Sequence, residues 1–295
     1  SLAPEKPDDR TMGMTCWFQA RECETARPFE PLEWAYTFKS CDDLPYGADQ
    51  HKQYHLGYWW IELGGEADTI HGTEELRDEL LKIVYGVWDH IKNHCPRREE
   101  ARNWALDWIN FLPARRESRR YVGAHVLCQG DIESGGRFDD VVAYGGWTMD
   151  DHHPAGFWSG RRGVPPTQFH PSPSPYGIPY RCLYSRDISN LMFAGRCHSA
   201  THMALSSTRV MGTGSVMGQA VGTAAAIAVR EGGDPSGVHD CMHELQQTLL
   251  RDDCYLPGVP QQFGELTRCA KLTANRGDPE PVRDGINRQV GENPH

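Results

Sequence analysis

Residues 190–230 read Asn190-Leu-Met-Phe-Ala-Gly-Arg-Cys-His-Ser-Ala-Thr-His-Met-Ala-Leu-Ser-Ser-Thr-Arg-Val-Met-Gly-Thr-Gly-Ser-Val-Met-Gly-Gln-Ala-Val-Gly-Thr-Ala-Ala-Ala-Ile-Ala-Val-Arg230. Apolar residues at 191–194 predict a short buried strand, and the small polar residues after them predict a loop. Residues 210–230 carry almost no charge and predict one long helix, which Gly232-Gly233 would end. The stretch therefore predicts a strand, a loop and a helix in that order.

Three glycines distinguish this helix. Gly214, Gly218 and Gly222 recur at four-residue spacing and would share one face. Because each glycine weakens a helix, three of them suggest that another group packs close to the backbone. The Ser-Ser-Thr run at 206–208 could cap the free amides at the start of the helix. Such a helix start suits an electron-rich group, such as a phosphate or a flavin carbonyl, and a helix packed tightly on a sheet is the alternative.

The same stretch resembles the C-terminal signature of bacterial FAD-dependent oxidoreductases with a glutathione-reductase-like flavin fold. The matching segments within it are 190–196, 199–202, 207–211 and 217–225. Other segments match in the same order along the chain: 58–62, 77–80, 88–93, 116–120, 143–147 and 178–184. The resemblance spans residues 10–258 and rests on several separate motifs.

The resemblance implies FAD as the cofactor and indicates where it would bind. Gly195 and Arg196, at the end of the strand, would meet the ribityl and pyrophosphate groups. The backbone amides of residues 208–211, helped by Arg209, would stabilise the negative charge that builds on the reduced flavin. The residues expected to bind the cofactor are Gly195, Arg196, Ser207, Thr208, Arg209, Val210, Met211 and Gly214.

The chain has no Gly-x-Gly-x-x-Gly motif, with which the N-terminal Rossmann unit of such enzymes holds the FAD pyrophosphate. Gly212-Thr-Gly214 has different spacing to the next glycine and lies inside the predicted helix. We therefore expect an internal piece of a longer flavoenzyme, with the Rossmann region in cis or on a separate chain. Residues 281–295 resemble the entry to a galactose-binding-like β-sandwich and stop before that module could fold.

The predicted fold class is α+β or α/β, a strand-rich substrate domain followed by the C-terminal strand, loop and helix of an FAD-binding domain. Residues 1–128 would form the substrate-binding part, with a helical pair at 73–111. Residues 129–258 would hold a lid loop at 150–176 and the FAD-contacting part, and 259–295 an extended tail. Strands are expected at 11–18, 34–38, 57–63, 121–127 and 141–147, and a further helix at 238–250.

The helical pair rests on two apolar patterns. The first helix would be capped by Thr73, and its predicted apolar face is Leu76, Leu80, Ile83, Val84, Val87, Trp88 and Ile91. The second helix, expected at 99–111, would turn inward Ala101, Trp104, Trp108 and Ile109. Tyr58, Trp59 and Trp60 are expected to be core residues rather than a sugar-stacking platform.

Histidines are the candidate catalytic bases, because oxidation of a C–H or O–H bond at a flavin needs a proton acceptor. His152 and His153 follow two aspartates in the predicted lid loop, and these carboxylates could orient an imidazole. His202 lies beside the predicted flavin position, and Tyr180 is a candidate hydrogen-bond donor to substrate or flavin. The alternatives are a solvated loop, a structural histidine at 202, and a metal site built on the Asp/His loop.

A basic cluster could bind an acidic group. Arg116, Arg119 and Arg120 surround Glu117 in the sequence. Guanidinium groups suit planar carboxylates and phosphates, so the cluster could hold an acidic substrate or the FAD pyrophosphate. An ion-pair network that joins two strands is the alternative.

Composition excludes several function classes. The net charge of −10 disfavours nonspecific binding to nucleic acid or to an anionic membrane, and the apolar run at 220–229 is too short to span a bilayer. The ten cysteines show neither Cys-x-x-Cys nor regular spacing, which disfavours a zinc or iron–sulfur site, so no metal is expected. Their scatter favours reduced thiols in a cytoplasmic protein, with export and one or two disulfides as the alternative.

These features together predict an FAD-dependent oxidoreductase that moves a hydride from a small polar substrate to flavin while a histidine takes the proton. The resemblance of the tail to a carbohydrate-binding module suggests a sugar-type alcohol. One alternative is the non-catalytic half of a split flavoenzyme that needs a separate Rossmann chain. A second is a metal-dependent hydrolase that uses the Asp/His loop.

Overall fold

The structure, a computed structural model, describes residue 6, residues 8–45 and residues 61–286. The chain forms two compact units, each described by itself. Unit 1 contains residues 119–150 and 169 onward, and unit 2 contains residues 4–118 and 151–168. Strands β7 (Met149–His152) and β8 (Thr167–His170) pair with each other, and the chain passes from one unit to the other within each of them.

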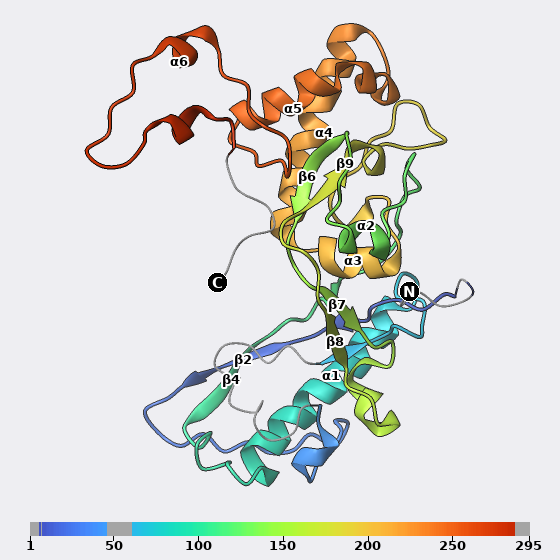
Figure 1. Cartoon of the computed structure of the whole chain (residues 1–295). Coiled ribbons are helices and arrows are strands. Elements are labelled where there is room, and N and C mark those ends of the chain that lie inside the picture. The colour runs from blue at the N-terminus through green and yellow to red at the C-terminus, as the bar shows by residue number, and fades with distance from the viewer. Residues whose placement is uncertain (1–5, 7, 46–60, 287–295) are drawn as a thin grey trace. The chain divides into compact units, whose positions relative to one another are not determined.

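Unit 1 is built on an antiparallel pair of strands, β6 (Val141–Gly145) and β9 (Tyr176–Pro179), in which Gly145 lies opposite Tyr176. Two helices, α4 (Met211–Glu231) and α5 (Met242–Arg251), contact β6 and each other (Figure 1). The core between them contains β-branched and aromatic residues from the strands and small residues from α4. The helices thus cover the strand pair.

Alanines bring α4 close to the sheet. Ala220, Ala224 and Ala228 recur every four residues and are all buried, so they share one face of the helix. Gly232 then adopts the left-handed conformation, with φ of 65°, and ends α4. Both the long helix and its glycine stop are confirmed, within one residue at each end.

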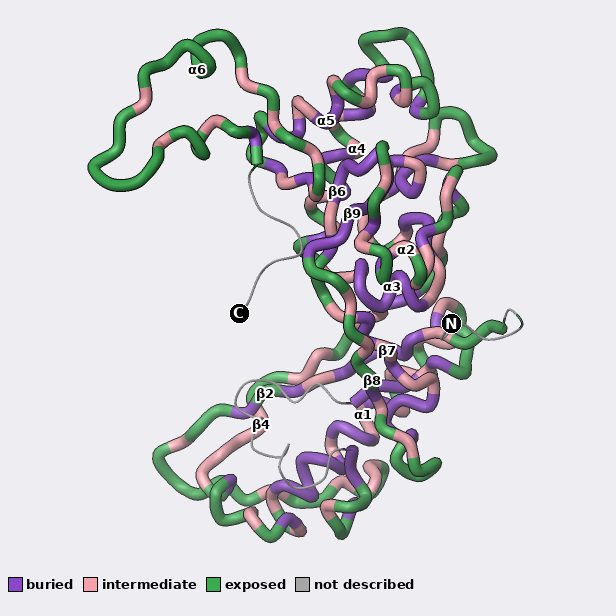
Figure 2. Tube along the Cα trace, viewed as in Figure 1, coloured by how far each residue is buried: buried purple, intermediate pink, exposed green. Residues whose placement is uncertain are grey.

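Unit 2 combines a three-stranded sheet, a two-stranded ribbon and one long helix. Strand β1 (Met14–Thr15) lies between β3 (Glu62–Leu63) and β5 (Ala114–Arg115), with antiparallel pairing on both sides. The ribbon pairs β2 (Phe18–Glu22) with β4 (Trp104–Ile109). Figure 2 shows buried residues along α1 (Thr73–Asp89), and both residues of β1 and both of β3 are buried as well.

The apolar face predicted for α1 is confirmed. Its members from Leu80 onward are buried, and Leu76 at the first turn is half-buried. The predicted cap is wrong by one position, because Gly72 is the N-cap and Thr73 is the first helical residue. The Thr73 hydroxyl instead donates to the carbonyl of Thr69 at 2.8 Å. At its other end α1 continues into a π-helical turn, η3 (His90–His94).

The second helix of the expected pair is wrong. Residues 104–109 form strand β4, whose Trp104 lies opposite Glu22 and whose Ile109 lies opposite Phe18. The four-residue spacing of Trp104 and Trp108 suggested a helix, but aromatic and β-branched residues also favour a strand. Pairing with the distant strand β2 favours the strand over the helix for this segment. A local sequence pattern carries no information about such a partner.

Other predicted segments also differ from the structure. The expected lid loop at 150–176 contains parts of β7 and β9, all of β8 and a helical segment, η4 (Gly156–Arg162), so it is not structureless. The expected strands at 191–194 and 121–127 form isolated bridges rather than ladders, for example Tyr184 with Met192. Tyr58, Trp59 and Trp60 lie outside the described residues.

Shorter elements complete the description: η1 (Cys41–Asp43), α2 (Gln129–Glu133), η5 (Tyr180–Cys182), η6 (Gly195–Cys197), α3 (His202–Thr208), η7 (Pro235–Cys241), α6 (Glu265–Cys269) and η8 (Glu280–Arg283). The helix expected at 238–250 begins as η7 and continues as α5. None of the ten cysteines, all of which lie in the described residues, forms a disulfide. A helix with the length and apolar character of a membrane span is absent from the described residues.

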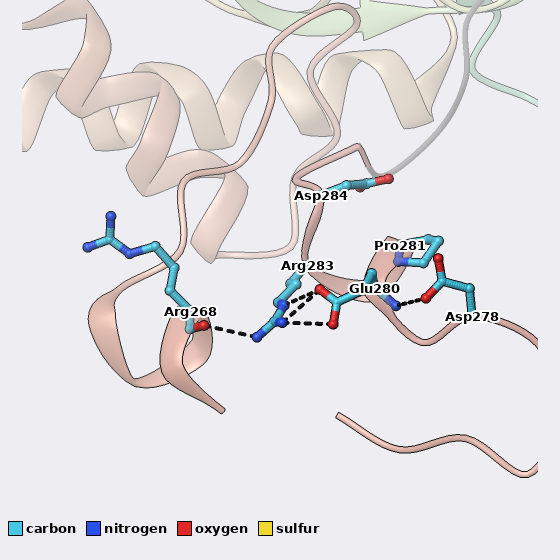
Figure 3. A pocket seen from close by; sticks show the side chains of 6 residues that line it. All are labelled: Arg268, Asp278, Glu280, Pro281, Arg283 and Asp284. Carbon is cyan, nitrogen blue, oxygen red and sulfur yellow. Dashed lines mark hydrogen bonds and ion pairs between the residues drawn. The ribbon is translucent and has the colours of Figure 1, made fainter. Parts of the chain in front are cut away.

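The C-terminal segment is organised by one arginine. Arg283 pairs with the carboxylate of Glu280 and donates to the backbone carbonyl of Arg268 (Figure 3). It also donates to the carbonyl of Ala270. The pocket beside it, of about 510 Å³, is lined by Arg268, Asp278, Glu280, Pro281, Arg283 and Asp284. Arg283, the last residue of η8, thus connects that helix to the end of α6.

Candidate functional site

The start of α4 is the centre of the candidate site. Thr201 caps the preceding helix α3, its hydroxyl accepting the amide of Ala204 at 3.4 Å. Residues 206–208 therefore lie inside α3 and are buried, so the prediction that they cap α4 is wrong. The N-cap of α4 is Val210, whose side chain makes no capping hydrogen bond. The first-turn amides of α4 are left with no side-chain cap.

Glycines leave the surface beside this helix start free of side-chain bulk. A Cβ atom added at Gly195 or at Gly212 would meet no heavy atom within 4 Å. A Cβ at Gly214 would lie 3.5 Å from the Cα of Gly195, so the two backbones are close neighbours. Gly195 has φ of 70°, which favours glycine. Gly195 and Gly212 therefore leave the backbone of this loop and of the first turn of α4 uncovered at these two positions.

The other two glycines of the predicted face, Gly218 and Gly222, are open to solvent. Added Cβ atoms at Gly218 and Gly222 would meet nothing within 4 Å, and both residues are exposed. Among the described residues no part of the chain therefore packs on Gly218 or Gly222, and the expected group at this face stays a prediction. At the start of this face, Met211 has 89% of its surface exposed.

A buried histidine that was not among the predicted site residues holds in place the loop around Gly195, the glycine loop. His198 is fully buried, and its Nδ1–H donates to the carbonyl of Gly195 at 2.7 Å. Its Nε2 lies 3.1 Å from the hydroxyl of Thr208. The pKa of His198 is lowered to about 4, chiefly by burial and to a smaller extent by the charge of Arg120, although the hydrogen bond to Gly195 acts in the opposite direction. A neutral imidazole therefore links the loop to α3.

A second polar chain holds α3. The hydroxyl of Ser207 donates to the carbonyl of Trp147 at 2.5 Å, so the hydroxyl of Tyr176 must donate to Ser207, also at 2.5 Å. Burial raises the pKa of Tyr176 to about 12. The hydroxyl of Ser207 is thus engaged in hydrogen bonds within the protein. Residues 207 and 208 would therefore contribute to ligand binding by holding the start of α4 in position.

Arg209 is held by an ion pair. Its Nη2 lies 2.7 Å from Oδ2 of Asp150, with 12% and 10% of the two side chains exposed. Asp150 was a candidate to orient His152, but this carboxylate binds the arginine between α3 and α4 instead. The pair anchors β7 to the segment that precedes α4.

His152 belongs to a polar cluster in unit 2. Its Nδ1 lies 2.8 Å from Oε2 of Glu62, and the same oxygen accepts Nη1 of Arg116 at 2.8 Å. Only 2% of the His152 side chain is exposed. The adjacent His153 has its Nδ1 accepting the amide of Ala155 at 3.1 Å. These contacts hold the histidines in the unit 2 structure.

The two remaining catalytic candidates, His202 and Tyr180, have different surroundings. His202 is the first residue of α3 and is half-buried, within the same unit as the glycine loop. Tyr180 is fully buried, and its hydroxyl donates to the carbonyl of Pro235 at 2.7 Å. Burial raises the pKa of Tyr180 well above its usual value. We therefore leave Tyr180 out of the candidate site.

The three arginines of the predicted basic cluster do not all belong to one unit, so neither unit alone contains the predicted anion-binding site. Arg116 lies in unit 2 and binds Glu62, whereas Arg119 and Arg120 belong to unit 1. Glu117, expected at the centre of the cluster, accepts the amide of Met12 at 2.8 Å. Arg196, a predicted cofactor residue, is exposed.

Comparison with known proteins gives one match. The family model described as FAD dependent oxidoreductase matches residues 4–249. No curated protein and no solved structure matches the chain. The matched range covers most of both units, including the start of α4 and the glycine loop.

Proposed function

Because the chain belongs to the FAD dependent oxidoreductase family, with FAD as its cofactor, we propose that it forms the substrate-binding and flavin-contacting part of such an enzyme. The reaction proposed is hydride transfer from a small polar substrate, with a sugar-type alcohol as the first class to test. The single observation that supports the proposed flavin position is the uncapped, glycine-lined start of α4.

The residues at this position fit a planar cofactor. Side chains at Gly195 or Gly212 would occupy open space beside the amides of α4, and glycine keeps that space clear. A helix start carries a partial positive charge, which favours an electron-rich group without a titrating residue. When bound, FAD would supply the hydride acceptor. The glutathione-reductase-like fold of bacterial relatives is the arrangement we propose for the whole enzyme.

The chain's own residues would act mainly by preorganisation. His198 and Thr208 fix the loop of Gly195 to α3, and the ion pair of Arg209 with Asp150 fixes the segment between α3 and α4. The amides at the start of α4 are therefore held in place before any ligand arrives. Fixed dipoles aimed at developing negative charge stabilise it without having to reorient during the reaction.

Among the three histidine candidates, we assign the proton acceptor to His202. It shares unit 1 with the proposed flavin position and is half-buried. His152 is almost fully buried and bound to Glu62, which makes it a structural residue of unit 2. His153 remains the second choice, because its Nδ1 already accepts a backbone amide.

The histidine assignment predicts a kinetic defect without loss of cofactor. His202→Ala should slow flavin reduction by roughly 10²-fold or more, the usual contribution of a general base, while FAD stays bound. Stopped-flow measurement of flavin bleaching with substrate would show it, with His153→Ala as the matched variant. A reduction rate unchanged by His202→Ala would remove it from the role, and a defect only in His153→Ala would transfer the role to that residue.

We also propose that a Rossmann region, in cis or on a separate chain, completes the cofactor site. The motif that holds the FAD pyrophosphate does not occur in the sequence. Gly218 and Gly222 on α4 are exposed, together with Met211 and Val229, and this mostly apolar face is suited to cover by another protein segment. Ten cysteines without a disulfide favour the reducing cytoplasm for the assembled enzyme.

Flavin colour separates the alternatives. Protein that becomes yellow only after a Gly-x-Gly-x-x-Gly chain is added would support the split enzyme, and yellow protein without it would show that this chain holds FAD by itself. The hydrolase alternative has no support in the structure. Asp150 binds Arg209, His152 binds Glu62, and the aspartates and histidines at 150–153 form no metal-binding group among the described residues.

Bulk at the glycine surface should weaken flavin binding without weakening the helix. Gly214→Leu places a side chain beside Gly195, so we expect a roughly 10- to 100-fold higher Kd for FAD in the assembled enzyme, which is about 1.4–2.7 kcal/mol. Leucine also favours a helix over glycine by up to about 1 kcal/mol, so stability should not fall. Flavin fluorescence titration measures the Kd, and Gln219→Leu, at an exposed position of the same helix, is the control. Equal Kd values for the two variants would contradict the proposed flavin position.

A further inference from the structure

Three potential metal ligands meet in unit 2, far from the glycine loop in the sequence. The Sγ atoms of Cys41 and Cys95 and a ring nitrogen of His90 all lie within 4.8 Å of one another. Cys41 begins η1, His90 begins the π-helical turn after α1, and Cys95 follows that turn. His90 and Cys95 are buried and Cys41 is half-buried. We propose that these three residues form a Zn²⁺ site, with a water molecule as fourth ligand.

The spacing of the donor atoms fits tetrahedral zinc. With Zn–S of about 2.3 Å and Zn–N of about 2.0–2.1 Å, a tetrahedral angle separates sulfur from nitrogen by about 3.5 Å. The Sγ of Cys41 lies 3.5 Å from the Nε2 of His90. The pair could therefore receive the ion with little movement of either side chain.

His90 has the orientation of a metal-binding histidine. Its Nδ1 lies 2.8 Å from the carbonyl oxygen of Phe38, so Nδ1 carries the proton and donates it. That hydrogen bond leaves the lone pair of Nε2 directed toward the sulfur of Cys41. A second hydrogen bond that fixes the tautomer and ring orientation is the usual outer support of a ligating histidine.

The backbone holds both cysteines in place. Ser40 caps η1 through a capping box with Asp43, which fixes the start of the segment at Cys41. The π-helical turn widens the end of α1, and the amide of Cys95 donates to the carbonyl of His90 at 2.7 Å. The amide of Arg97 donates to the Sγ of Cys95 at 3.4 Å, which helps to fix the position of that sulfur.

The donor set selects the class of metal. Two thiolates and one imidazole suit zinc and disfavour magnesium and calcium, which prefer oxygen ligands. The ion would tie the loop of η1 to the end of α1, two segments that lie about fifty residues apart in the chain. That distance explains why the spacing of the cysteines predicted no metal site. The proposal is independent of flavin binding, because all of its ligands lie in unit 2.

Metal analysis of the full chain tests the proposal. After purification with a thiol reductant and no chelator, addition of ZnCl₂ should leave one Zn²⁺ per chain after gel filtration. Co²⁺ in its place should give the visible absorption of a tetrahedral thiolate complex. Cys41→Ser and Cys95→Ser should each lose the stoichiometric metal. His90→Gln should raise the Kd for Zn²⁺ at least tenfold above that of the wild type. Cys254→Ser, at a buried cysteine of unit 1, should retain one equivalent.

A measurement on the unmodified chain covers the case in which a variant fails to fold. Bound Zn²⁺ should protect Cys41 and Cys95 from alkylation by iodoacetamide, as read by mass spectrometry, and EDTA should remove the protection. The proposal is overturned if the reduced chain retains no more Zn²⁺ than Cys41→Ser does, or if Zn²⁺ leaves the alkylation of both cysteines unchanged. A Cys41–Cys95 disulfide that forms in air, with no metal uptake by the reduced chain, would identify the pair as a redox couple and also overturn it.

Discussion

Glu62→Ala should lower the free energy of unfolding by about 3–5 kcal/mol, the usual cost of removing one partner from a buried charged cluster. One oxygen of Glu62 accepts from both His152 and Arg116 at 2.8 Å. Without the carboxylate, the Arg116 guanidinium, which is 16% exposed, and the nearly buried His152 imidazole would lose their hydrogen bonds to Glu62. Both groups would still carry the free-energy cost of their removal from water. The effect should appear in unit 2, which contains all three residues.

The geometry also orders the possible substitutions at this position. An ionised carboxylate only accepts, so His152 must donate from Nδ1 and Arg116 from Nη1. Glu62→Gln keeps an accepting oxygen and the shape of the side chain but loses the charge. It should therefore destabilise the unit less than Glu62→Ala. The double variant Glu62→Ala, Arg116→Ala should recover part of the loss, because it removes the stranded cation as well.

Tryptophan fluorescence during urea unfolding is a suitable measurement, since eight of the nine tryptophans lie in the residue ranges of unit 2 and only Trp147 lies in unit 1. Glu66→Ala is the matched control. Glu66 pairs with Arg162 on the surface of the same unit, and exposed ion pairs add little to stability. A Glu62→Ala midpoint no lower than that of Glu66→Ala would show that the buried cluster does not stabilise the fold.

Long helices were the part of the fold that sequence pattern predicted best. The apolar period of α1 and the uncharged, glycine-ended run of α4 are local features, and a helix forms all its backbone hydrogen bonds locally. Strand β4 shows the opposite case. Its backbone pairs with β2, more than eighty residues earlier, so the choice of strand over helix depended on a contact that no window of the sequence contains.

The candidate site likewise has one part that could be predicted from the sequence and another that could not. Its position at the start of α4 followed from the pattern of glycines and from the family resemblance. The supporting contacts did not, because His198 reaches Gly195 and Thr208 through a bend of the chain, and Asp150 reaches Arg209 from fifty-nine residues away. Short polar residues before a helix suggested caps, but residues 206–208 continue α3 instead. Side-chain partners of this kind depend on tertiary structure.

His198 should make the stability of unit 1 depend on pH. Its pKa is about 4 in the folded chain, against 6.5 for an ordinary histidine, because the imidazole is buried. Below pH 6.5 the unfolded chain takes up a proton that the folded chain does not. The unfolding free energy should therefore fall by about 1.4 kcal/mol for each pH unit, and by roughly 3 kcal/mol in total between pH 6.5 and pH 4. Above pH 6.5 this contribution is constant.

Replacement of the His198 imidazole separates its contribution to the pH dependence of stability from the contributions of other groups. In His198→Asn, the side-chain amide can still donate to Gly195 but has no group that titrates in this range, so the variant should lose about 1.4 kcal/mol per pH unit less than the wild type on acidification. Urea unfolding at pH 7, 6, 5 and 4.5, followed by far-ultraviolet circular dichroism, would measure both slopes. This signal comes from all helices of the chain, α4 and α5 among them, and the difference between the two slopes isolates the contribution of His198. His243→Asn, at an exposed position of α5, should keep the wild-type slope. Parallel slopes for the wild type and His198→Asn would mean that the folded chain protonates His198 as readily as the unfolded chain does, and that the imidazole is not the neutral link between the glycine loop and α3.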